Sequence, residues 1–316
     1  MLAFFLLLIG FILVIKASDL LVDCATSLAI RFKVPKMLIA LTIVSFGTCA
    51  PEIAISFQSV SSQNGDIAFA NVIGSCIVNV FLIVGLAAFL KPIRIQNTTI
   101  KKELPLLLTI TLGFSILMLD SLFQKDATNT FSRIDGIILI LLFGLFVFYL
   151  IQMVIRKKEE NEVNLPKYKP LLAFVLLILS LLVITYSSDL IVNNAEILAR
   201  QLHISEKIIT MVLIVIGTSL PEMSMTITSA RKGEFDMAIG NIIGTNIFNI
   251  CIVLGLPVAL YGSVSLAHFS FMDILFVFLS SFILYLFSKS EKEISKREGL
   301  CMILLFVSYY SYILFF

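Results

Sequence analysis

The segment GTCAPE at Gly47–Glu52 returns as GTSLPE at Gly217–Glu222, and NVIGSCIVNVFLIVG at Asn71–Gly85 returns as NIIGTNIFNICIVLG at Asn241–Gly255. Both returns have the same offset of 170 residues, and no gap is needed over about seventy residues. The best-matched residues are polar, which a scaffold facing only lipid does not need. The repeat therefore indicates two similar halves that share a polar site.

The composition identifies the class of protein. Of 316 residues, 59% are apolar and only 14% are charged, with a mean hydropathy of +1.03. Soluble domains have about 45–50% apolar and about 25% charged residues. These values exclude a cytoplasmic enzyme, a nucleic-acid-binding protein and a disordered chain. They predict a multi-pass protein surrounded by the lipid bilayer. The five cysteines have neither metal-binding spacing nor an even number that would indicate a disulfide framework.

Breaks at charges, Pro and Gly divide the chain into ten apolar segments, most of them near the roughly 20 residues that a spanning helix needs. The predicted spans are Leu2–Leu28, Pro35–Ser59, Ile67–Leu90, Leu104–Leu119, Ile134–Ile155, Leu171–Leu198, Ile208–Ala230, Met237–Leu260, Met272–Ser288 and Leu300–Phe316. Because each half has five spans, the second half enters the membrane from the opposite side. We therefore predict an all-α membrane protein with ten transmembrane helices in two inverted-topology repeats, a plan that recurs in secondary transporters. The repeats are 1–156 and 170–316, joined by a cytoplasmic linker at 157–169.

The positions of the basic residues predict the orientation in the membrane. If the N-terminus is outside, 18 of the 23 Lys and Arg residues fall in inner segments and four in outer segments. The remaining cation, Lys16, lies within the first span. Positive residues are concentrated on the cytoplasmic side of membrane proteins. We therefore predict that both termini are extracytoplasmic and that the chain resides in the cell membrane.

Two glutamates lie deep within predicted spans, and each directly follows a proline. Glu52 follows Pro51 and Glu222 follows Pro221. A carboxylate there costs roughly 2.5–3.5 kcal/mol on insertion scales, so it indicates a functional site. The prolines release the carbonyls of the preceding turn from regular helix bonding. Carboxylate and carbonyl oxygens together are ligands that suit Ca²⁺ or Na⁺.

The second repeated segment supplies further polar groups. Ser75 and Asn79 share one helix face, as do Thr245 and Asn249, because residues four apart are neighbours on a helix. We predict a ring formed by Glu52, Glu222, Asn79 and Asn249, with hydroxyls and carbonyls on either side. A bound cation would relieve the repulsion between the two carboxylates. Ordinary hydrogen bonding between helices is the alternative role for Ser75 and Thr245.

The motifs GTxxPE and NxxG[ST]xxxN, present twice in inverted halves, resemble those of the cation/calcium exchanger superfamily and most closely those of prokaryotic sodium/calcium exchangers. The resemblance covers essentially the whole chain. It implies alternating-access exchange of Na⁺ for Ca²⁺ at a midplane ion cluster, without a cofactor. The ion ligands that it implies are Glu52, Glu222, Asn79, Asn249, Thr48, Thr218, Ser75, Thr245 and Ser219, with backbone oxygens of Ser45 and Val215.

Three positions depart from the pattern of this family or vary within it. Cys49 stands where Ser is usual, whereas its counterpart Ser219 keeps the hydroxyl. Cys76 replaces the Asn that follows Ser in the family motif, and Asn246 retains it. Asn249 occupies a position where some prokaryotic members and the potassium-dependent exchangers carry Asp. The Asn resembles the potassium-independent pattern and leaves two formal negative charges in the site.

The leading hypothesis is a Na⁺/Ca²⁺ antiporter that works as a monomeric functional unit. The alternative within the same class is a Ca²⁺/H⁺ antiporter, or one for another divalent cation, in which Glu52 and Glu222 carry protons. An intramembrane enzyme is disfavoured, since no Ser–His, HExxH or paired-Asp arrangement is present. A passive channel is disfavoured because one inverted-repeat chain contains no oligomeric pore ring. The long first and sixth spans are expected to slide as a pair past the rest of the protein.

Overall fold

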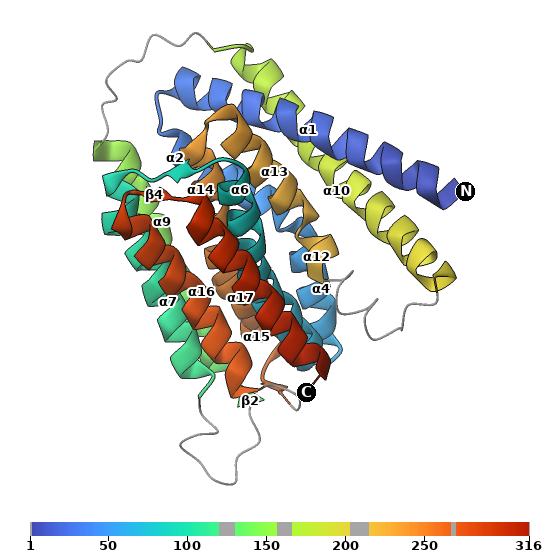
Figure 1. Cartoon of the computed structure of the whole chain (residues 1–316). Helices are drawn as coiled ribbons and strands as arrows, with labels where there is room; N and C mark the ends of the chain where they lie inside the picture. Colours follow the sequence, from blue (N-terminus) through green and yellow to red (C-terminus); the bar gives the residue numbers. More distant parts are fainter. Residues whose placement is uncertain (1, 120–129, 157–165, 203–214, 267–269, 316) are drawn as a thin grey trace.

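The computed structural model describes residues 2–119, 130–156, 166–202, 215–266 and 270–315. The first half contains α1 (Leu2–Phe32); α2 (Lys36–Ile39), η1 (Ala40–Val44), α3 (Ser45–Thr48) and α4 (Ala50–Ser61); α5 (Gly65–Ile77), η2 (Val78–Val84) and α6 (Gly85–Leu90); η3 (Thr99–Glu103) and α7 (Leu104–Leu117); and α9 (Arg133–Arg156). The second half contains α10 (Pro170–Gln201); α12 (Val215–Thr218) and α13 (Leu220–Lys232); α14 (Phe235–Phe248), η5 (Asn249–Leu254) and α15 (Gly255–Tyr261); α16 (Phe271–Ser290); and α17 (Lys296–Phe315). Segments labelled η are π-helical. Figure 1 shows the resulting bundle.

Each predicted span coincides with one helix or with a run of consecutive helical segments. Among the described residues, six helices are long and apolar enough to cross a membrane by length and composition, or seven if the bent pair 36–61 counts as one span. The predicted span 208–230 is described only from Val215 onward, and linker residues 157–165 also lie outside the described residues. The structure adds two small antiparallel sheets that the all-α prediction lacked. They pair β1 (Ile93–Arg94) with β4 (Glu293–Ile294), and β2 (Thr130–Phe131) with β3 (Val264–Ser265).

Two contacts place a pseudo-twofold axis through the bundle. The hydroxyls of Thr111 and Ser281 are 3.1 Å apart, and the Asn246 amide donates to the Cys76 carbonyl at 3.4 Å. In both pairs the residues are separated by 170 positions. A residue can contact its own counterpart only close to the symmetry axis. The inverted repeat read from the sequence is therefore also the symmetry of the fold.

The two halves interlock. Helix α9 of the first half packs on α15 of the second, and α17 of the second packs on α6 of the first. Both sheets also join strands from different halves. The central rods α5–η2–α6 and α14–η5–α15 are the most enclosed spans, with 83% of the most apolar window buried in each. The bundle core consequently belongs to both repeats.

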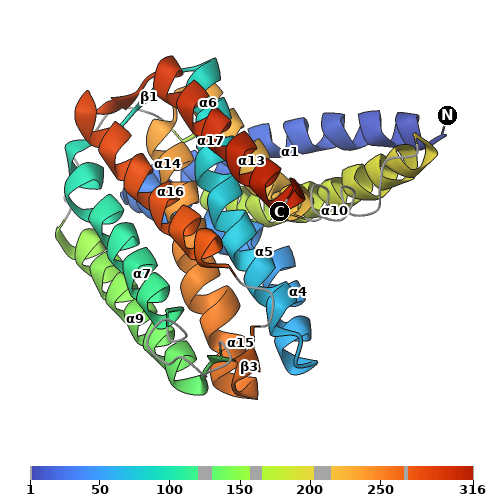
Figure 2. The same ribbon diagram turned by 60° about the horizontal axis from the view of Figure 1, so that its bottom comes forward.

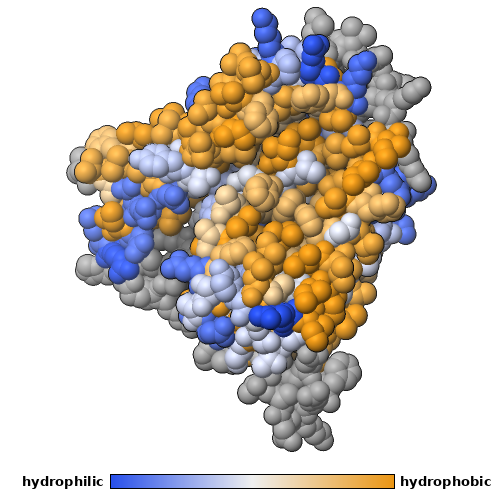
Figure 3. Space-filling model, turned by 180° about the vertical axis from the view of Figure 1, so that it is seen from behind, coloured by the Kyte–Doolittle hydropathy of each residue, from blue (hydrophilic) through white to orange (hydrophobic). Residues whose placement is uncertain are grey.

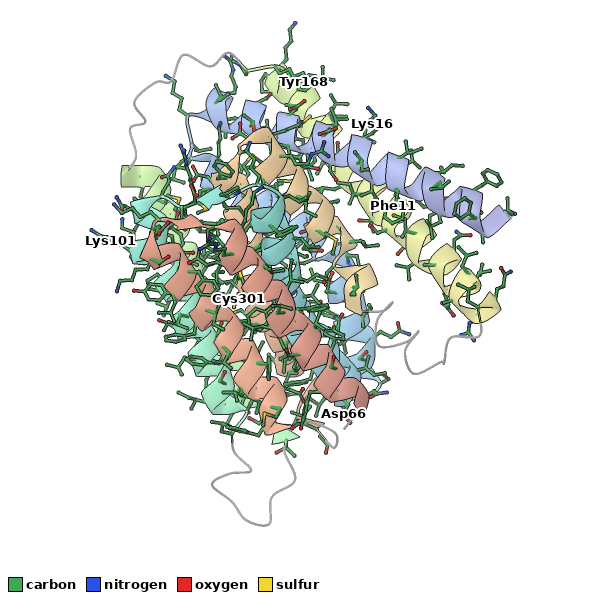
Figure 4. All side chains as sticks on the ribbon, in the orientation of Figure 1. Phe11, Lys16, Asp66, Lys101, Tyr168 and Cys301 are labelled. Carbon is green, nitrogen blue, oxygen red and sulfur yellow. The ribbon has the colours of Figure 1, made fainter. Side chains whose placement is uncertain are left out.

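Helices α1 and α10 pack along each other and project from the bundle as a pair, in both Figure 1 and Figure 2. Hydrophobic residues cover much of the face in Figure 3, and hydrophilic residues lie mainly at its top, its left side and its lower part. Figure 4 shows Lys101 and Asp66 at opposite ends of the bundle. This distribution is that of a protein with an apolar belt and polar ends, as expected for a multi-pass membrane protein.

Candidate cation site

The two GTxxPE segments form helix breaks. Helix α3 ends at Thr48 and α4 begins at Ala50, with the joining Cys49 at ψ 2° rather than the helical value. The axes on either side of this break differ by 52°. Ser219 joins α12 to α13 in the same way, with ψ 5°. The cause is local, because proline in the first turn of α4 and of α13 cannot donate the hydrogen bond that would continue the preceding helix.

Each break places a carboxylate in the first turn of a helix. Glu52 lies in the first turn of α4 and Glu222 in the first turn of α13. Both residues are fully buried, and none of their four carboxylate oxygens has a hydrogen-bond partner in the structure. The partial positive charge of a helix N-terminus favours a carboxylate at this position. This partial charge alone does not compensate for burial, because a buried carboxylate also needs hydrogen-bond donors or a cation.

The environment of each carboxylate is drawn from both halves. The hydroxyls of Thr218 and Ser75 lie beside Glu52, and the hydroxyl of Thr48 lies beside Glu222. The two carboxylates are also close enough to repel each other. At the level of helices, α4 packs on η5 and α13 packs on η2. The helix that carries the glutamate of each half thus packs on the asparagine segment of the other half.

Both predicted asparagine ligands lie in π-helical segments. Asn79 lies in η2 and Asn249 begins η5, and both side chains are fully buried. Insertion of a π turn locally widens a helix, and such turns are frequent at functional sites. The π-helical segments were not predicted from the sequence, because the residues around them have the apolar pattern of an ordinary α-helix.

Two further contacts near the carboxylates are equivalent under the 170-residue repeat. The hydroxyls of Ser219 and Ser75 are 3.5 Å apart. The equivalent contact in the other half joins the Cys49 thiol to the Thr245 carbonyl at 4.0 Å. The Thr245 hydroxyl is buried and has no partner. The structure therefore brings polar residues of the two helix breaks and of both repeated segments next to one another in the buried interior.

Comparison with known proteins identifies the family. The family described as sodium/calcium exchanger protein matches residues 2–152 and 172–315. The chain belongs to the sodium/calcium exchanger family. It is 36% identical to the inner membrane protein YrbG of Escherichia coli over 81% of this chain and 79% of that protein. It is 29% identical to the sodium/calcium exchanger MaX1 of Methanosarcina acetivorans over 97% of each chain.

A solved structure of the sodium-calcium exchanger NCX_Mj, from a crystal soaked with Na⁺ and Sr²⁺, has the same fold. Its TM-score to this chain is 0.84, with 28% sequence identity, and 98% of each chain is covered. The protein is therefore a membrane transporter of the cation/calcium exchanger class rather than an enzyme.

The structure shows hydrogen bonds for one of the two expected backbone ligands, Ser45, and only the position in the chain for the other, Val215. The Ser45 carbonyl already accepts hydrogen bonds from the Thr48 hydroxyl at 3.2 Å and from the Cys49 amide at 3.0 Å. The Ser45 hydroxyl lies within hydrogen-bond distance of two further carbonyls. Ser45 is therefore engaged in holding the break. Val215 is the first described residue of α12, two positions before Gly217 of the second Gly–Thr pair.

The chemistry of the cluster in this exchanger is that of an oxygen site. Among the described residues, no group of three or more His, Cys, Asp or Glu side chains is arranged to hold a metal ion. The cluster instead combines two carboxylates with neutral hydroxyl, amide and carbonyl oxygens. Such a set suits a hard cation that is bound and released, because few charged ligands hold it.

Proposed function

We propose that this member of the sodium/calcium exchanger family exchanges Na⁺ for Ca²⁺ across the cell membrane. The observation that carries the proposal is the pair of fully buried carboxylates, Glu52 and Glu222, which form no ion pair and whose oxygens accept no hydrogen bond of normal geometry among the described residues. An unpaired buried carboxylate is costly, and two that repel each other are more so. A divalent cation, or more than one Na⁺, bound between them would neutralise both. The ion is the cargo of the transporter.

The proposed ligands are the residues expected from the motifs. They are Glu52, Glu222, Asn79, Asn249, Thr48, Thr218, Ser75, Thr245 and Ser219, with backbone oxygens of Ser45 and Val215. The ion couple is supported by the relatives, since MaX1 is named a sodium/calcium exchanger and the NCX_Mj crystal was soaked with Na⁺ and Sr²⁺. Asn249 supports independence from K⁺, since it adds no third charge to the site.

Transport would proceed by alternating access, with α1 and α10 sliding as a pair against the interlocked bundle. The buried residues of α1 concentrate in the half that ends at Phe32. There, Asp23 forms ion pairs of 2.7 Å with both Lys167 and Lys232. The Asp23 carboxylate raises the pKa of Lys167, which keeps this partner charged. These ion pairs link α1 to Lys167 and to the end of α13, and they would have to break or shift for the pair to slide.

The proposed orientation places the linker in the cytoplasm and both termini outside. It rests on the excess of Lys and Arg in the segments on the linker side. The relative YrbG is an inner membrane protein, which is consistent with the cell membrane. In this orientation the sodium gradient would drive Ca²⁺ out of the cell.

The test is flux of ⁴⁵Ca²⁺ into proteoliposomes under an imposed Na⁺ gradient, with the wild type compared with Glu52→Gln and Glu222→Gln. Each substitution keeps the size of the side chain and removes one of the two charges. We expect each variant to lose at least about 90% of the Na⁺-driven uptake, because a lost charged ligand costs on the order of 1.5–3 kcal/mol.

Parallel gradients of K⁺ and H⁺ identify the coupling ion. A Glu298→Gln variant is the matched control, because Glu298 is a carboxylate that bonds to Ser295 and Ser290 away from the site. Uptake that is driven by a pH gradient and indifferent to Na⁺ would assign the protein to Ca²⁺/H⁺ exchange. Uptake unaffected by both site substitutions would disprove the assignment of the site.

A further inference from the structure

We propose that Asn246 is a positioning residue that aims the Asn79 amide oxygen into the cation site, and that Cys76 leaves the counterpart Asn249 without such support. The two repeats would then contribute unequally to cation binding. The proposal rests on the proposed function of the cluster, and it concerns residues beside the ligands rather than the ligands themselves.

The contact begins at the backbone of the first half. The Cys76 carbonyl can only accept a hydrogen bond, and it accepts one from the Asn246 amide nitrogen at 3.4 Å. The Asn246 amide oxygen therefore points the other way, where it accepts from the Asn79 amide nitrogen at 3.0 Å. Because the Asn79 amide nitrogen donates to Asn246, the Asn79 amide oxygen must point to the opposite side of the amide group. This chain of two hydrogen bonds determines the direction of the Asn79 amide.

The oxygen of Asn79 is buried and has no partner in the structure. Asn79 is completely buried, and Asn246 is 1% exposed, so water does not compete for these groups. An amide oxygen with no hydrogen-bond donor is available to a cation. The amide is thus oriented by the protein itself before an ion binds, and this preorganisation lowers the cost of binding.

The counterpart position lacks this device. Under the 170-residue repeat, the counterpart of the Asn79–Asn246 contact joins Asn249 to Cys76. A thiol is a weak donor and a weak acceptor, and it cannot orient an amide as a second amide does. Consistent with this, both the nitrogen and the oxygen of Asn249 are buried without a partner. An ion bound near Asn249 would have to orient that amide itself.

The test exchanges the two residues between the repeats. Purified wild type and the Asn246→Cys, Cys76→Asn and double variants are compared by calorimetric titration with Ca²⁺ in the absence of Na⁺. Outer-shell partners of metal ligands typically contribute about 10–100-fold to affinity. We expect Asn246→Cys to weaken Ca²⁺ binding by about tenfold or more and Cys76→Asn to strengthen it. The double variant should recover part of the lost affinity, because an Asn at position 76 can then orient Asn249.

Thermal unfolding separates positioning from a general effect on stability. The same two side chains already occur at equivalent positions, so both substitutions are compatible with the fold. A purely structural role would change stability without the opposite changes in affinity. Equal Ca²⁺ affinity in wild type and Asn246→Cys would overturn the positioning role while leaving the cation site intact. Wild-type protein that binds no Ca²⁺ would overturn the proposed function, and the positioning role with it.

Discussion

Cys49 and Ser219 occupy equivalent helix breaks, yet they offer different atoms to an ion. The Ser219 hydroxyl lies 3.5 Å from the Ser75 hydroxyl, so two hard oxygens are together on that side. On the other side the Cys49 thiol lies near the Thr245 carbonyl. Sulfur is a soft ligand, whereas Na⁺ prefers oxygen. The difference of one atom between counterpart residues thus makes the two flanks of the site chemically unequal.

This inequality predicts opposite effects of two near-isosteric substitutions. Cys49→Ser should lower the Na⁺ concentration for half-maximal exchange by roughly fivefold, which corresponds to about 1 kcal/mol of added ligand free energy. Ser219→Cys should raise it by a similar factor. The measurement is Na⁺-driven ⁴⁵Ca²⁺ flux at varied Na⁺. Cys301→Ser is the control, since this thiol is exposed on α17. Identical Na⁺ dependence in the two site variants would contradict the assignment of Cys49 and Ser219 to Na⁺ binding.

At the scale of elements, glycines allow helices from different halves to meet at backbone distance. A Cβ at Gly299 would lie 2.7 Å from the Gly85 carbonyl, where α17 crosses α6. A Cβ at Gly136 would lie 2.7 Å from the Gly255 carbonyl, where α9 crosses α15. In each case the obstructing atom is backbone and cannot rotate away. The same small-residue contact therefore secures both crossings of the interlocked bundle.

Helix α9 contains two glycines, Gly136 at the crossing with α15 and Gly144 away from it, so a substitution of Gly144 is the control for one of Gly136. Gly136→Ala should destabilise the protein by about 1–3 kcal/mol, the usual cost of overpacking. Gly144→Ala should be neutral or stabilising by up to about 1 kcal/mol, because a Cβ there meets nothing within 4 Å and Ala is the better helix former. Thermal unfolding in detergent can be followed with a thiol-reactive dye, since Cys24, Cys49, Cys76 and Cys251 are buried. Equal unfolding temperatures for the two variants would rule out the close crossing.

At the scale of the whole molecule, inversion of the second repeat determines how the charges are distributed. Helices that are related by the repeat cross the membrane in opposite directions, so their ends face different compartments. Equivalent segments of the two repeats contain different numbers of Lys and Arg residues. This difference produces the excess of Lys and Arg on the linker side. That excess, rather than the fold itself, selects one orientation of a nearly symmetric molecule.

The predicted orientation can be measured with reporters. Alkaline phosphatase fused after residue 316 should be active in an Escherichia coli host, because it folds outside the cytoplasm. Green fluorescent protein fused at the same point should be dark. Reporters fused in the linker at residue 160 should give the opposite result and serve as the internal control. An active cytoplasmic reporter at residue 316 would invert the proposed direction of every helix.

Much of this architecture could be predicted from the sequence. The helical spans, the two similar halves and the two glutamates follow from composition, a constant offset and charge, which are local or periodic properties. Proline before Glu52 and Glu222 also predicted the helix breaks, since the effect of proline acts within one turn. The two-residue sheets and the π segments were not predicted, because short pairings and a single inserted residue leave no periodic signal.

The sequence by itself determined that this is an inverted-repeat membrane protein with two buried carboxylates, since hydrophobic periodicity and repetition do not depend on packing. Only the tertiary structure decided which groups meet. It placed Thr218 beside Glu52 across the halves and joined Asn79 to Asn246 rather than to a residue of its own repeat. Such contacts depend on how closely α4, α13, η2 and η5 approach. That approach is set by the whole interlocked bundle, and no local stretch of sequence encodes it.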